Sequence, residues 1–248
     1  MAVRRFTGEE PLSIPYLLND LAQMSLARNY LEWQYRLIEP YLGNRVLEVG
    51  CGTGNLTGLL LQRRAVIAVD RQAECVRRTR ERYCHETQLR VEHCGPPDAN
   101  FAELRHATPD SCVCLNVIEH IERDGEALAA MAAVLRPGGR VILLAPAFEA
   151  LYGKIDYRLG HYRRYTKRDM ERIACAASLE VAQLHYMNLP GFFGWWINAR
   201  LFGRATQSPF QIRFFDRFIV PFAARIEALV PPLFGQSVLA VLRRPSSR

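Results

Sequence analysis

No stretch of the 248-residue chain is apolar for long enough to form a membrane-spanning helix, which needs about 18 consecutive uncharged residues. The first residues carry charges with no apolar segment behind them, so we expect no secretory signal there. Internal repeats and low-complexity segments are also lacking. Hydrophobic residues make up 49% of the chain and charged residues 23%, which excludes global disorder and fibrous architectures and favours one globular domain.

Cysteine spacings typical of a paired zinc site are absent, and so is an excess of acidic residues. Cys112 and Cys114 flank one residue in an apolar run, and alternation along a strand should place both on the same face. We interpret the seven cysteines as reduced, structural thiols of a cytoplasmic protein and expect no metal. The net charge of +7 favours an anionic ligand or membrane surface but does not by itself indicate nucleic-acid binding.

Short apolar runs alternate with stretches of helical spacing over the first part of the chain. In one such stretch, from Asp124 to Arg136, apolar residues recur every three or four positions between a capping residue and a Pro-Gly-Gly turn. Strands that alternate with helices predict an α/β fold with a parallel sheet covered by helices on both faces. The expected strands are residues 45–49, 65–70, 89–93, 111–116 and 140–145.

The pattern changes after the fifth expected strand. Residues 146–165 are aromatic and basic without a clear period, and Thr166 to Asp169 matches a capping box that opens a helix to about residue 177. Two more strands are expected at 179–187 and 236–242, separated by a segment too long for a simple loop, which must carry helices. We therefore predict a single domain made of an N-terminal helical flank (1–42), a core (43–189), an aromatic insertion (190–235), and a last strand and tail (236–248).

The most informative segment is the glycine-rich turn after the first expected strand. The dinucleotide-binding pattern requires glycines at its first, third and sixth positions, and it fails here because Asn55 or Thr57 occupies the sixth. The turn has instead the form E-x-G-x-G-x-G from Glu48, and a carboxylate at that place repels a pyrophosphate but suits a cationic ligand. Asp70 ends the second strand, sixteen residues after Gly54, where an acid can cap a helix or accept hydrogen bonds from a ribose diol.

Four segments in order resemble the class I S-adenosylmethionine-dependent methyltransferases: VLEVGCGTGNLT (46–57), AVD (68–70), CLNVIEHIERD (114–124) and LRPGGRVILLAPA (135–147). The resemblance covers roughly residues 28–187. It implies a Rossmann-like seven-stranded sheet with the last strand antiparallel, and a site above the carboxyl ends of the strands. It also implies S-adenosyl-L-methionine as cofactor and S-adenosyl-L-homocysteine as product.

The resemblance further assigns roles to residues around the cofactor. Glu48 would lie near its amino group, Asp70 would hold the ribose hydroxyls and Arg71 would flank the adenine. Asn116 would touch the sulfonium region, and Asn29-Tyr30-x-x-Trp33 resembles a segment that closes over the cofactor; alternatively, Tyr30 and Trp33 are core residues. The methionine part would be lined, largely through backbone, by Gly50, Cys51, Gly52 and Gly54.

Two histidines are candidate bases, because an oxygen or nitrogen nucleophile can need one for methyl transfer. His120 follows Glu119 at the end of the fourth strand, and Asn116 stands where metal-binding RNA-methylating relatives have a further acid. His161 lies in an HYRRYT run that resembles a bacterial subgroup of the family and, distantly, quinone-precursor O-methyltransferases. For Glu119 and His120 the alternative is a strand-end pair that hydrogen-bonds the next loop, and for the arginines of the HYRRYT run it is pairing with backbone carbonyls that fastens the loop. The substrate side is assigned to Tyr157 and Tyr165 as walls and Arg163 or Arg164 as a clamp for an anionic group.

The insertion, with Trp195, Trp196 and several phenylalanines and arginines, is assigned to the acceptor side. It either roofs a pocket for an apolar acceptor, lies on an anionic bilayer, or forms ordinary amphipathic helices. We predict a methyltransferase that acts on a small or medium, largely apolar acceptor of natural-product, quinone-like or lipid-linked type. Oxygen is the favoured site of methylation. Peripheral contact with the inner membrane face is a further option, with no nucleic-acid partner and no obligate protein partner. The alternative is a noncatalytic cofactor-binding protein of the same fold.

Overall fold

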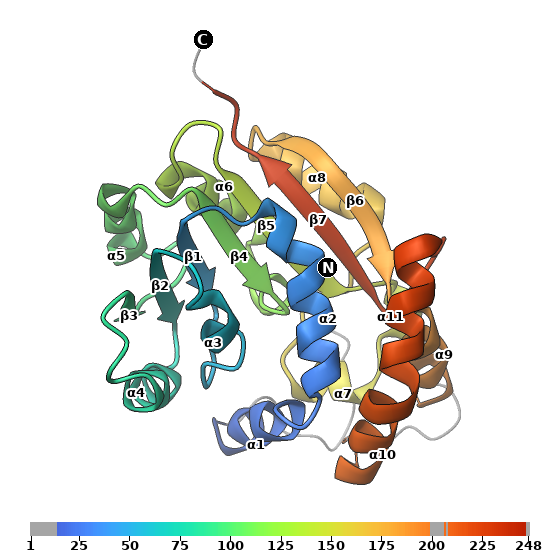
Figure 1. Ribbon diagram of the computed structural model, residues 1–248. Helices are drawn as coiled ribbons and strands as arrows, with labels where there is room; N and C mark the ends of the chain where they lie inside the picture. The colour runs from blue at the N-terminus through green and yellow to red at the C-terminus, as the bar shows by residue number, and fades with distance from the viewer. Residues whose placement is uncertain (1–13, 199–205, 207, 247–248) are drawn as a thin grey trace.

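The computed structural model describes residues 14–198, 206 and 208–246, which form a central sheet between two layers of helices (Figure 1). The sheet has seven strands in the order β3-β2-β1-β4-β5-β7-β6. All neighbouring pairs from β3 to β5 are parallel, whereas β7 runs antiparallel to both β5 and β6. This confirms the predicted fold class and the antiparallel last strand.

The strand bounds agree closely with the apolar runs. The five parallel strands are β1 (Arg45–Val49), β2 (Ala65–Asp70), β3 (Leu89–His93), β4 (Ser111–Leu115) and β5 (Arg140–Pro146). The two remaining strands are β6 (Glu180–Met187) and β7 (Ser237–Arg243). On β4, Cys112 and Cys114 are both fully buried in the same hydrophobic cluster, and Val113 belongs to the cluster on the other face, as strand alternation predicts.

Helices cover both faces of the sheet. One face packs against α5 (Ala99–Ala102), η2 (Glu103–Ala107), α6 (Asp124–Val134) and α8 (Lys167–Ala176). The other packs against α2 (Arg28–Ile38), α3 (Thr57–Leu60), α4 (Ala73–Arg82) and α11 (Val220–Leu229). The capping box predicted for α8 is present, because the Thr166 hydroxyl accepts a hydrogen bond from Asp169 N and the Asp169 carboxylate accepts one from Thr166 N.

The remaining short elements lie near the carboxyl ends of the parallel strands, at the bottom of Figure 1. They are α1 (Ile14–Met24) from the N-terminal flank, α7 (Lys154–Arg158) after β5, and α9 (Leu189–Ile197) and α10 (Pro209–Phe214) from the insertion. A π-helical turn, η6 (Phe215–Ile219), joins α10 to α11. Three 3₁₀ turns complete the fold: η1 (Glu39–Tyr41), η3 (Ile118–His120) and η4 (Glu149–Leu151). Within the described residues, no helix is long and apolar enough to cross a membrane.

The N-terminal flank and the insertion are joined by one buried carboxylate. Asp216 in η6 accepts hydrogen bonds from the backbone N–H groups of Asn29 and Tyr30, at 3.2 and 2.9 Å, in the first turn of α2. These N–H groups have no partner within their own helix, so the carboxylate satisfies them and its charge complements the helix dipole. Two segments far apart in sequence are thereby held together above the edge of the sheet where the strands end.

Candidate active site

A cavity of about 960 Å³ lies at the carboxyl ends of β1, β2, β4 and β5, the edge at which doubly wound sheets bind their ligands. Its floor is formed by the glycine turn and the strand ends. Its other walls come from α1, α2, α7, α9, α10 and η6, so both the flank and the insertion enclose it. Among its lining residues are Asp20, Tyr30, Gln34, Glu48, Gly50, Cys51, Gly52, Asp70, Arg71, Asn116, Glu119, His120, His161, Arg164 and Trp195.

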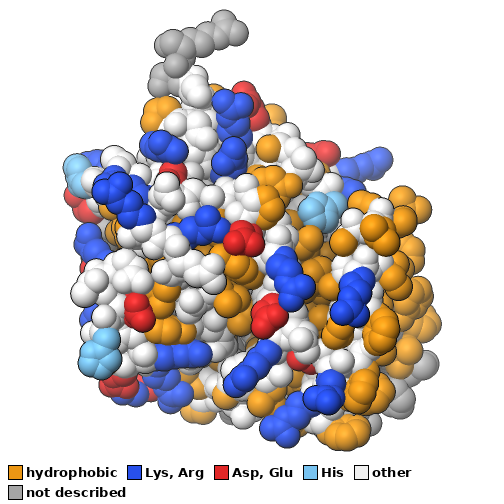
Figure 2. All heavy atoms as spheres, viewed as in Figure 1, with side chains coloured by type: hydrophobic (Ala, Val, Ile, Leu, Met, Phe, Trp, Pro, Cys, Tyr) orange, Lys and Arg blue, Asp and Glu red, His pale blue; other side chains and the backbone are white. Residues whose placement is uncertain are grey.

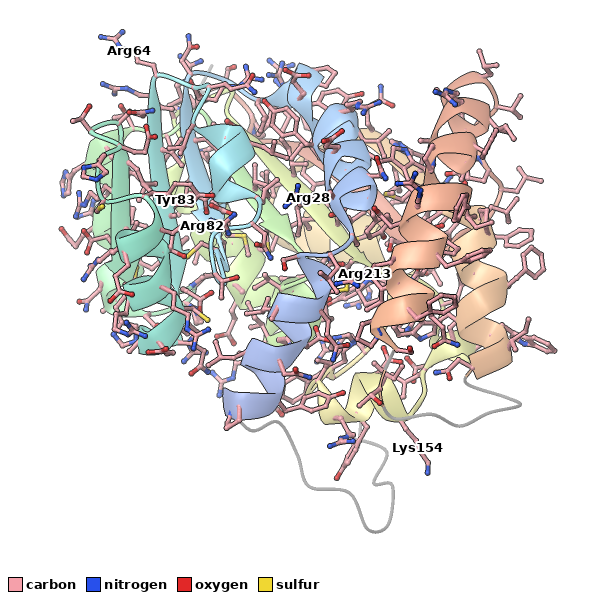
Figure 3. All side chains as sticks on the ribbon, turned by 60° about the horizontal axis from the view of Figure 1, so that its bottom comes forward. Arg28, Arg64, Arg82, Tyr83, Lys154 and Arg213 are labelled. Atoms are coloured by element: carbon pink, nitrogen blue, oxygen red, sulfur yellow. The ribbon has the colours of Figure 1, made fainter. Side chains whose placement is uncertain are left out.

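The glycine turn after β1 has a backbone conformation that other residues adopt only with strain. Gly50, Gly52 and Gly54 have φ angles of +77°, +54° and +80°. A Cβ atom on Gly50 would lie 2.2 Å from Val117 Cγ2, so glycine is required for space as well as for conformation. From the end of α4, Arg82 and the adjacent Tyr83 hold the turn by hydrogen bonds to the carbonyls of Thr53 and Gly54 (Figure 3).

Asp70 lies beside this turn at the end of β2. Its Oδ2 accepts a hydrogen bond from Gly52 N at 2.9 Å, and its Oδ1 accepts one from Gln72 N at 2.8 Å. Burial raises the pKa of this carboxyl above its usual value, an effect that the backbone hydrogen bonds partly offset. Each carboxylate oxygen retains capacity for another donor, so Asp70 can accept from a pair of neighbouring hydroxyls.

Glu48, on β1 below the turn, is the strongest structural indication of the ligand's charge. It is 2% exposed, and its Oε2 accepts a hydrogen bond from the Thr57 hydroxyl at 2.6 Å. Burial raises the pKa of this carboxyl to about 7. A buried carboxylate at a cavity wall is stabilised in its charged form by a cation, so Glu48 fits the ammonium group of the cofactor's methionine part.

The two aromatic residues of the Asn29-Tyr30-x-x-Trp33 segment have different environments. Trp33 is 4% exposed in the core cluster between α2 and the sheet, whereas Tyr30 lines the cavity, where burial raises the pKa of its hydroxyl. Gln34, one turn along α2, also lines the cavity, and its buried Nε2 has no hydrogen-bond partner among the described residues. The core interpretation therefore holds for Trp33, and Tyr30 and Gln34 present polar groups to a ligand.

Arg71 and Asn116 both line the cavity. Arg71 lines the cavity beside Cys94, Gly95 and Pro96 and pairs with Asp98, its Nη2 lying 3.6 Å from Asp98 Oδ1. Asn116 follows β4 in the left-handed region, with φ of +54°, and its N–H donates to the Leu144 carbonyl at 2.7 Å. Asn116 thus lines the cavity between the glycine turn and the end of β5.

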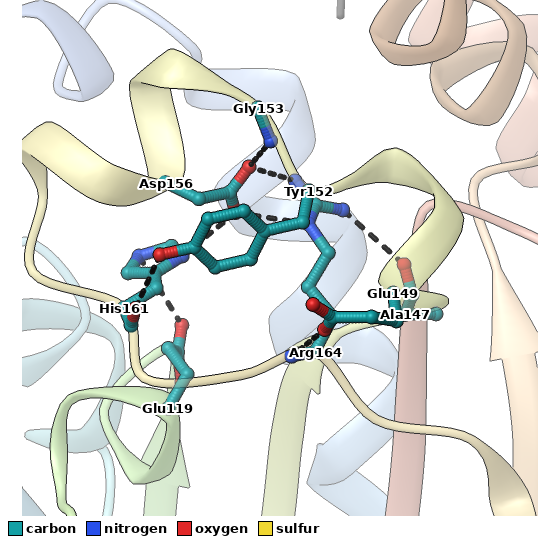
Figure 4. Close-up of polar contacts among 8 residues, drawn as sticks. All are labelled: Glu119, Ala147, Glu149, Tyr152, Gly153, Asp156, His161 and Arg164. Carbon is teal, nitrogen blue, oxygen red and sulfur yellow. Dashed lines mark hydrogen bonds and ion pairs between the residues drawn. The ribbon is translucent and has the colours of Figure 1, made fainter. Parts of the chain in front are cut away.

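His161 is the centre of a buried polar network (Figure 4). Its Nδ1 lies 2.9 Å from Asp156 Oδ1, and its Nε2 lies 4.0 Å from Glu119 Oε1. Asp156 also accepts hydrogen bonds from Gly153 N and from Nε and Nη2 of Arg164. Burial alone would raise the pKa of Asp156, but the Arg164 charge and these hydrogen bonds outweigh burial and hold the pKa at about 2.

Around His161, three further ionisable groups face the cavity. Burial raises the pKa of Glu119 to about 7 and that of Asp20, on α1, to about 6, and it lowers the pKa of His120 to about 3. The rings of His120 and His161 meet edge to face with centroids 4.6 Å apart. Because Glu119, His120 and His161 each offer one ligand atom within 4.8 Å of the others, they could hold a cation as well as move a proton.

The expected anion clamp is wrong for both arginines. Arg164 is buried, donates to Asp156 and to the Ala147 carbonyl, and has its guanidinium carbon 5.1 Å from the centroid of the Trp195 ring. Arg163 pairs with Asp124 and donates to the Glu122 carbonyl. These arginines fasten the loop, which was the alternative weighed for them.

Two expected substrate walls and one tryptophan also lie away from the cavity. Tyr165 is fully buried on the far side of the loop, where its hydroxyl donates to Asp124. Tyr157, on α7, is not among the residues that line the cavity. Trp195 does line it, but its neighbour Trp196 is 44% exposed on the outer face of α9. Successive helical residues point about 100° apart, so the two indoles cannot share one wall.

Three functional residues escaped the sequence interpretation. Asp156 lies five residues before His161. The only sign of its role in the sequence is that it is the single acid in the basic stretch 152–168. Asp20 and Gln34 lie in the flank, where nothing in the residue pattern marks them as facing a ligand. They reach the site because α1 and α2 cover it.

Comparison with known proteins agrees with this geometry. Residues 47–141 match a family described as a methyltransferase domain. An uncharacterised 37.1 kDa protein of a Streptomyces fradiae transposon is 30% identical over 175 residues, which are 68% of this chain and 49% of that protein. A ubiquinone biosynthesis O-methyltransferase of Bordetella avium is 31% identical over 111 residues, 45% of this chain and 46% of that protein. The chain thus spans about half the length of these relatives.

A solved geranyl diphosphate methyltransferase in complex with S-adenosylmethionine has the same fold, with a TM-score of 0.59 at 16% identity over 85% of this chain and 84% of that one. The match to the methyltransferase-domain family, over residues 47–141, begins in β1 and ends in β5. This region contains the glycine turn, Asp70 and Asn116. The methyltransferase match, the seven-stranded sheet and a cavity whose glycine turn and buried carboxylates fit the methyl donor lead to one conclusion. Residues 47–141 belong to the methyltransferase-domain family, and the described chain has the fold of the class I S-adenosylmethionine-dependent methyltransferases.

Proposed function

We propose that this chain transfers the methyl group of S-adenosylmethionine to a hydroxyl oxygen of a small or medium, largely apolar acceptor. The observation that carries this proposal is the Asp156–His161 pair, in which Asp156 is buried and His161 lines the same cavity as the glycine turn and Asp70. A cofactor site and a histidine oriented by a buried carboxylate therefore share one enclosed space. That is the arrangement required to bring a donor and a deprotonated oxygen together.

The protein has to position the acceptor oxygen beside the methyl group and remove one proton from that oxygen. The cofactor supplies an electrophilic methyl group on a sulfonium. When bound, S-adenosylmethionine would give its methyl group to the acceptor oxygen, and its sulfur would keep the electron pair of the broken carbon–sulfur bond. The hydroxyl proton passes to His161 Nε2, and Asp156, hydrogen-bonded at Nδ1, stabilises the resulting imidazolium. We assign Glu48, Asp70, Tyr30 and Asn116 to the cofactor and His161, with His120 beside it, to the acceptor.

The acceptor end of the cavity supports an apolar substrate. Its lining includes Leu17, Leu21, Met24, Ile121, Ile155, Leu159, Trp195, Ile212 and Phe215. The Bordetella avium relative takes part in ubiquinone biosynthesis as an O-methyltransferase, and the solved neighbour acts on geranyl diphosphate. We therefore place the acceptor among quinone-like, natural-product or lipid-linked hydroxyl compounds. The proposal includes no nucleic acid and no obligate protein partner.

The test is turnover with a matched panel of acceptors. The purified chain is incubated with S-adenosylmethionine and alkyl-substituted phenols and catechols, and with the corresponding anilines, while S-adenosylhomocysteine formation is measured. We expect product with the hydroxyl compounds, methylated at oxygen by mass spectrometry, and loss of turnover in His161→Gln. Product with anilines only would contradict transfer to oxygen. Tight binding of S-adenosylhomocysteine without turnover on any acceptor would instead support the noncatalytic alternative.

A further inference from the structure

The outer face of the insertion carries an exposed row of large apolar side chains. Every fourth residue from position 210 to 226 is Phe or Ile, and these five side chains are between 50% and 76% exposed: Phe210, Phe214, Phe218, Phe222 and Ile226. At the end of α11 and just after it, Leu229, Val230 and Leu233 are 84%, 68% and 90% exposed. An exposed apolar surface of this extent is uncommon on a monomeric protein and indicates an interaction site.

The geometry of the helix keeps this row together. In a regular α-helix, a row of every fourth residue drifts around the axis, because the period is 3.6. The π turn η6 at 215–219 has a longer period and reverses part of that drift. The rings of Phe210 and Phe214, both in α10, lie 6.4 Å apart, and those of Phe214 and Phe218, which enter the π turn, lie 5.2 Å apart. The result is one continuous stripe along α10, η6 and α11.

Helix α9 extends the stripe into a broader surface. Its inner side contributes Trp195 to the cavity, while Phe193 and Trp196 on its outer side are 51% and 44% exposed. Phe193 meets Phe234, at the end of the insertion, with ring centroids 6.0 Å apart. In Figure 2 the hydrophobic side chains gather along the right-hand margin, over α9, α10 and α11, with basic side chains among them. We call these exposed residues of 193–197 and 210–234 the apolar face.

The exposed charges on the helix that carries the stripe all have one sign. The helix from 209 to 229 contains two acids, and both point inward: Asp216 caps α2, and Glu227 accepts hydrogen bonds from Asn188 N and Leu189 N at 2.9 and 2.8 Å. The arginines of this helix, Arg213, Arg217 and Arg225, are exposed. Arg217 lies beside the stripe, with its guanidinium carbon 5.8 Å from the centroid of the Phe218 ring.

We propose that the apolar face docks on an anionic lipid bilayer, with Phe210, Phe218 and Phe222 inserted at the headgroup boundary and Arg217 and Arg225 against lipid phosphates. An amphipathic helix with aromatic side chains on one face and basic residues at its rim suits that environment. A second copy of the chain is the weaker occupant, because a symmetric contact would bring the arginine rims of both copies together without a compensating acid. The cavity wall and the apolar face share α9, so docking would bring the cavity close to apolar molecules in the bilayer.

The docking proposal does not rest on methyl transfer, so its test needs no acceptor. The full chain is floated with vesicles of one part phosphatidylglycerol to three parts phosphatidylcholine, and with phosphatidylcholine alone. We expect retention on the anionic vesicles that weakens as salt is raised. In Phe210→Ser/Phe218→Ser/Phe222→Ser the partition coefficient should fall about tenfold or more. In Arg217→Gln/Arg225→Gln it should fall roughly tenfold to thirtyfold.

Matched controls separate docking from general charge, hydrophobicity and unfolding. Arg136→Gln/Arg140→Gln removes two exposed arginines far from the apolar face, and Val181→Ser removes an exposed apolar side chain on β6. Both should be retained like the native chain. Every variant is also checked for its melting temperature and for binding of S-adenosylhomocysteine by calorimetry. Absence of retention on anionic vesicles, or retention unchanged in the phenylalanine variant, would overturn the proposal. A dimer dissolved by that variant, without vesicle binding, would assign the apolar face to a second copy instead.

Discussion

Asp156 fixes the tautomer of His161. Because its pKa is held at about 2, the carboxylate is ionised at neutral pH and can only accept, so the proton of the 2.9 Å hydrogen bond belongs to His161 Nδ1. The neutral ring then presents an unprotonated Nε2 on the side of Glu119 and the cavity. That is the form in which a histidine can act as a base.

His161→Gln tests this arrangement without disturbing the Asp156–Arg164 pair. We expect kcat to fall about a hundredfold or more, the usual range for loss of a positioned base, with little change in S-adenosylhomocysteine affinity. Asp156→Asn should lose similar activity and also stability, since it leaves the buried Arg164 charge unpaired. His185→Gln, on β6 and outside the cavity lining, is the control. Equal turnover in His161→Gln and the native chain would exclude His161 as the base.

The cluster of Glu119, His120 and His161 gives a second prediction, on metal removal. Its three ligand atoms lie within 4.8 Å of one another, but a cation there would occupy the Nε2 atom that we assign to proton transfer. We therefore expect turnover after dialysis against EDTA to equal that of the untreated chain, and added Mg²⁺ or Mn²⁺ to leave it unchanged. Activity that EDTA removes and a divalent cation restores would reassign the cluster to metal binding.

A third prediction concerns the ribose contact. Asp70→Ala removes two oxygens at the cavity wall, which leaves a bound diol without acceptors and should cost about 1–3 kcal/mol of cofactor affinity, or roughly tenfold to hundredfold in Kd. The backbone N–H groups of Gly52 and Gln72 also lose their partner, so a small fall in melting temperature is expected. Calorimetric titration with S-adenosylhomocysteine measures the effect, with Glu92→Ala, on β3 and outside the cavity lining, as control. A folded Asp70→Ala protein with native affinity would refute the contact.

Glu48 predicts how cofactor affinity depends on pH. Its pKa is about 7 in the folded protein without ligand, well above the usual 4.5, so the folded state holds a proton there that the unfolded state has released. The stability from this protonation is complete below about pH 4.5 and is lost as pH rises through about 7. An ammonium group favours the ionised carboxylate, so binding releases a proton below pH 7.

S-adenosylhomocysteine affinity should accordingly rise with pH up to about 7, by at most about tenfold per pH unit, and then level off. Calorimetry in buffers of different ionisation enthalpy measures the released proton. Glu48→Gln keeps the hydrogen bond to Thr57 within reach and should flatten the profile. An unchanged profile in that variant would show that Glu48 does not contact the ammonium group.

The cofactor half of the site could be predicted from sequence because its residues are contiguous with regular elements. Asp70 and Asn116 end or follow strands whose apolar runs are plain, so the parallel topology alone brings them to one edge. The acceptor half could not be predicted in the same way. Residues 146–165 have no hydrophobic periodicity. An isolated parallel β-bridge pairs Tyr165 with Ala147, and the Tyr165 side chain is buried away from the cavity.

Contacts between residues far apart in the sequence could not be predicted from the residue pattern either. Asp216 and Tyr30 are 186 residues apart, and only the packing of η6 on α2 shows that the insertion supports the flank. The adjacent Trp195 and Trp196 could not both face a ligand, yet nothing in their composition distinguishes them. The packing of their helix against η4 must be known before the inward-facing residue can be identified.

The glycine turn supports a final prediction, with a built-in control elsewhere in the chain. Gly50→Ala requires φ of +77° at a residue with a side chain and brings a Cβ to 2.2 Å from Val117 Cγ2. The backbone strain alone is worth about 1–3 kcal/mol, which lowers Tm by roughly 2–4 °C for each kcal/mol in a protein of this size. Adding Val117→Ala to the Gly50→Ala chain should relieve the steric contact with the new Cβ but not the backbone strain at position 50. Gly125→Ala, in α6 with no atom within 4 Å of the added Cβ, should instead raise stability by roughly 0.5–1 kcal/mol. Thermal melts of the native chain, Gly50→Ala, Gly50→Ala/Val117→Ala and Gly125→Ala check the expected order of stability. A Gly50→Ala protein that melted at or above the native Tm would contradict it.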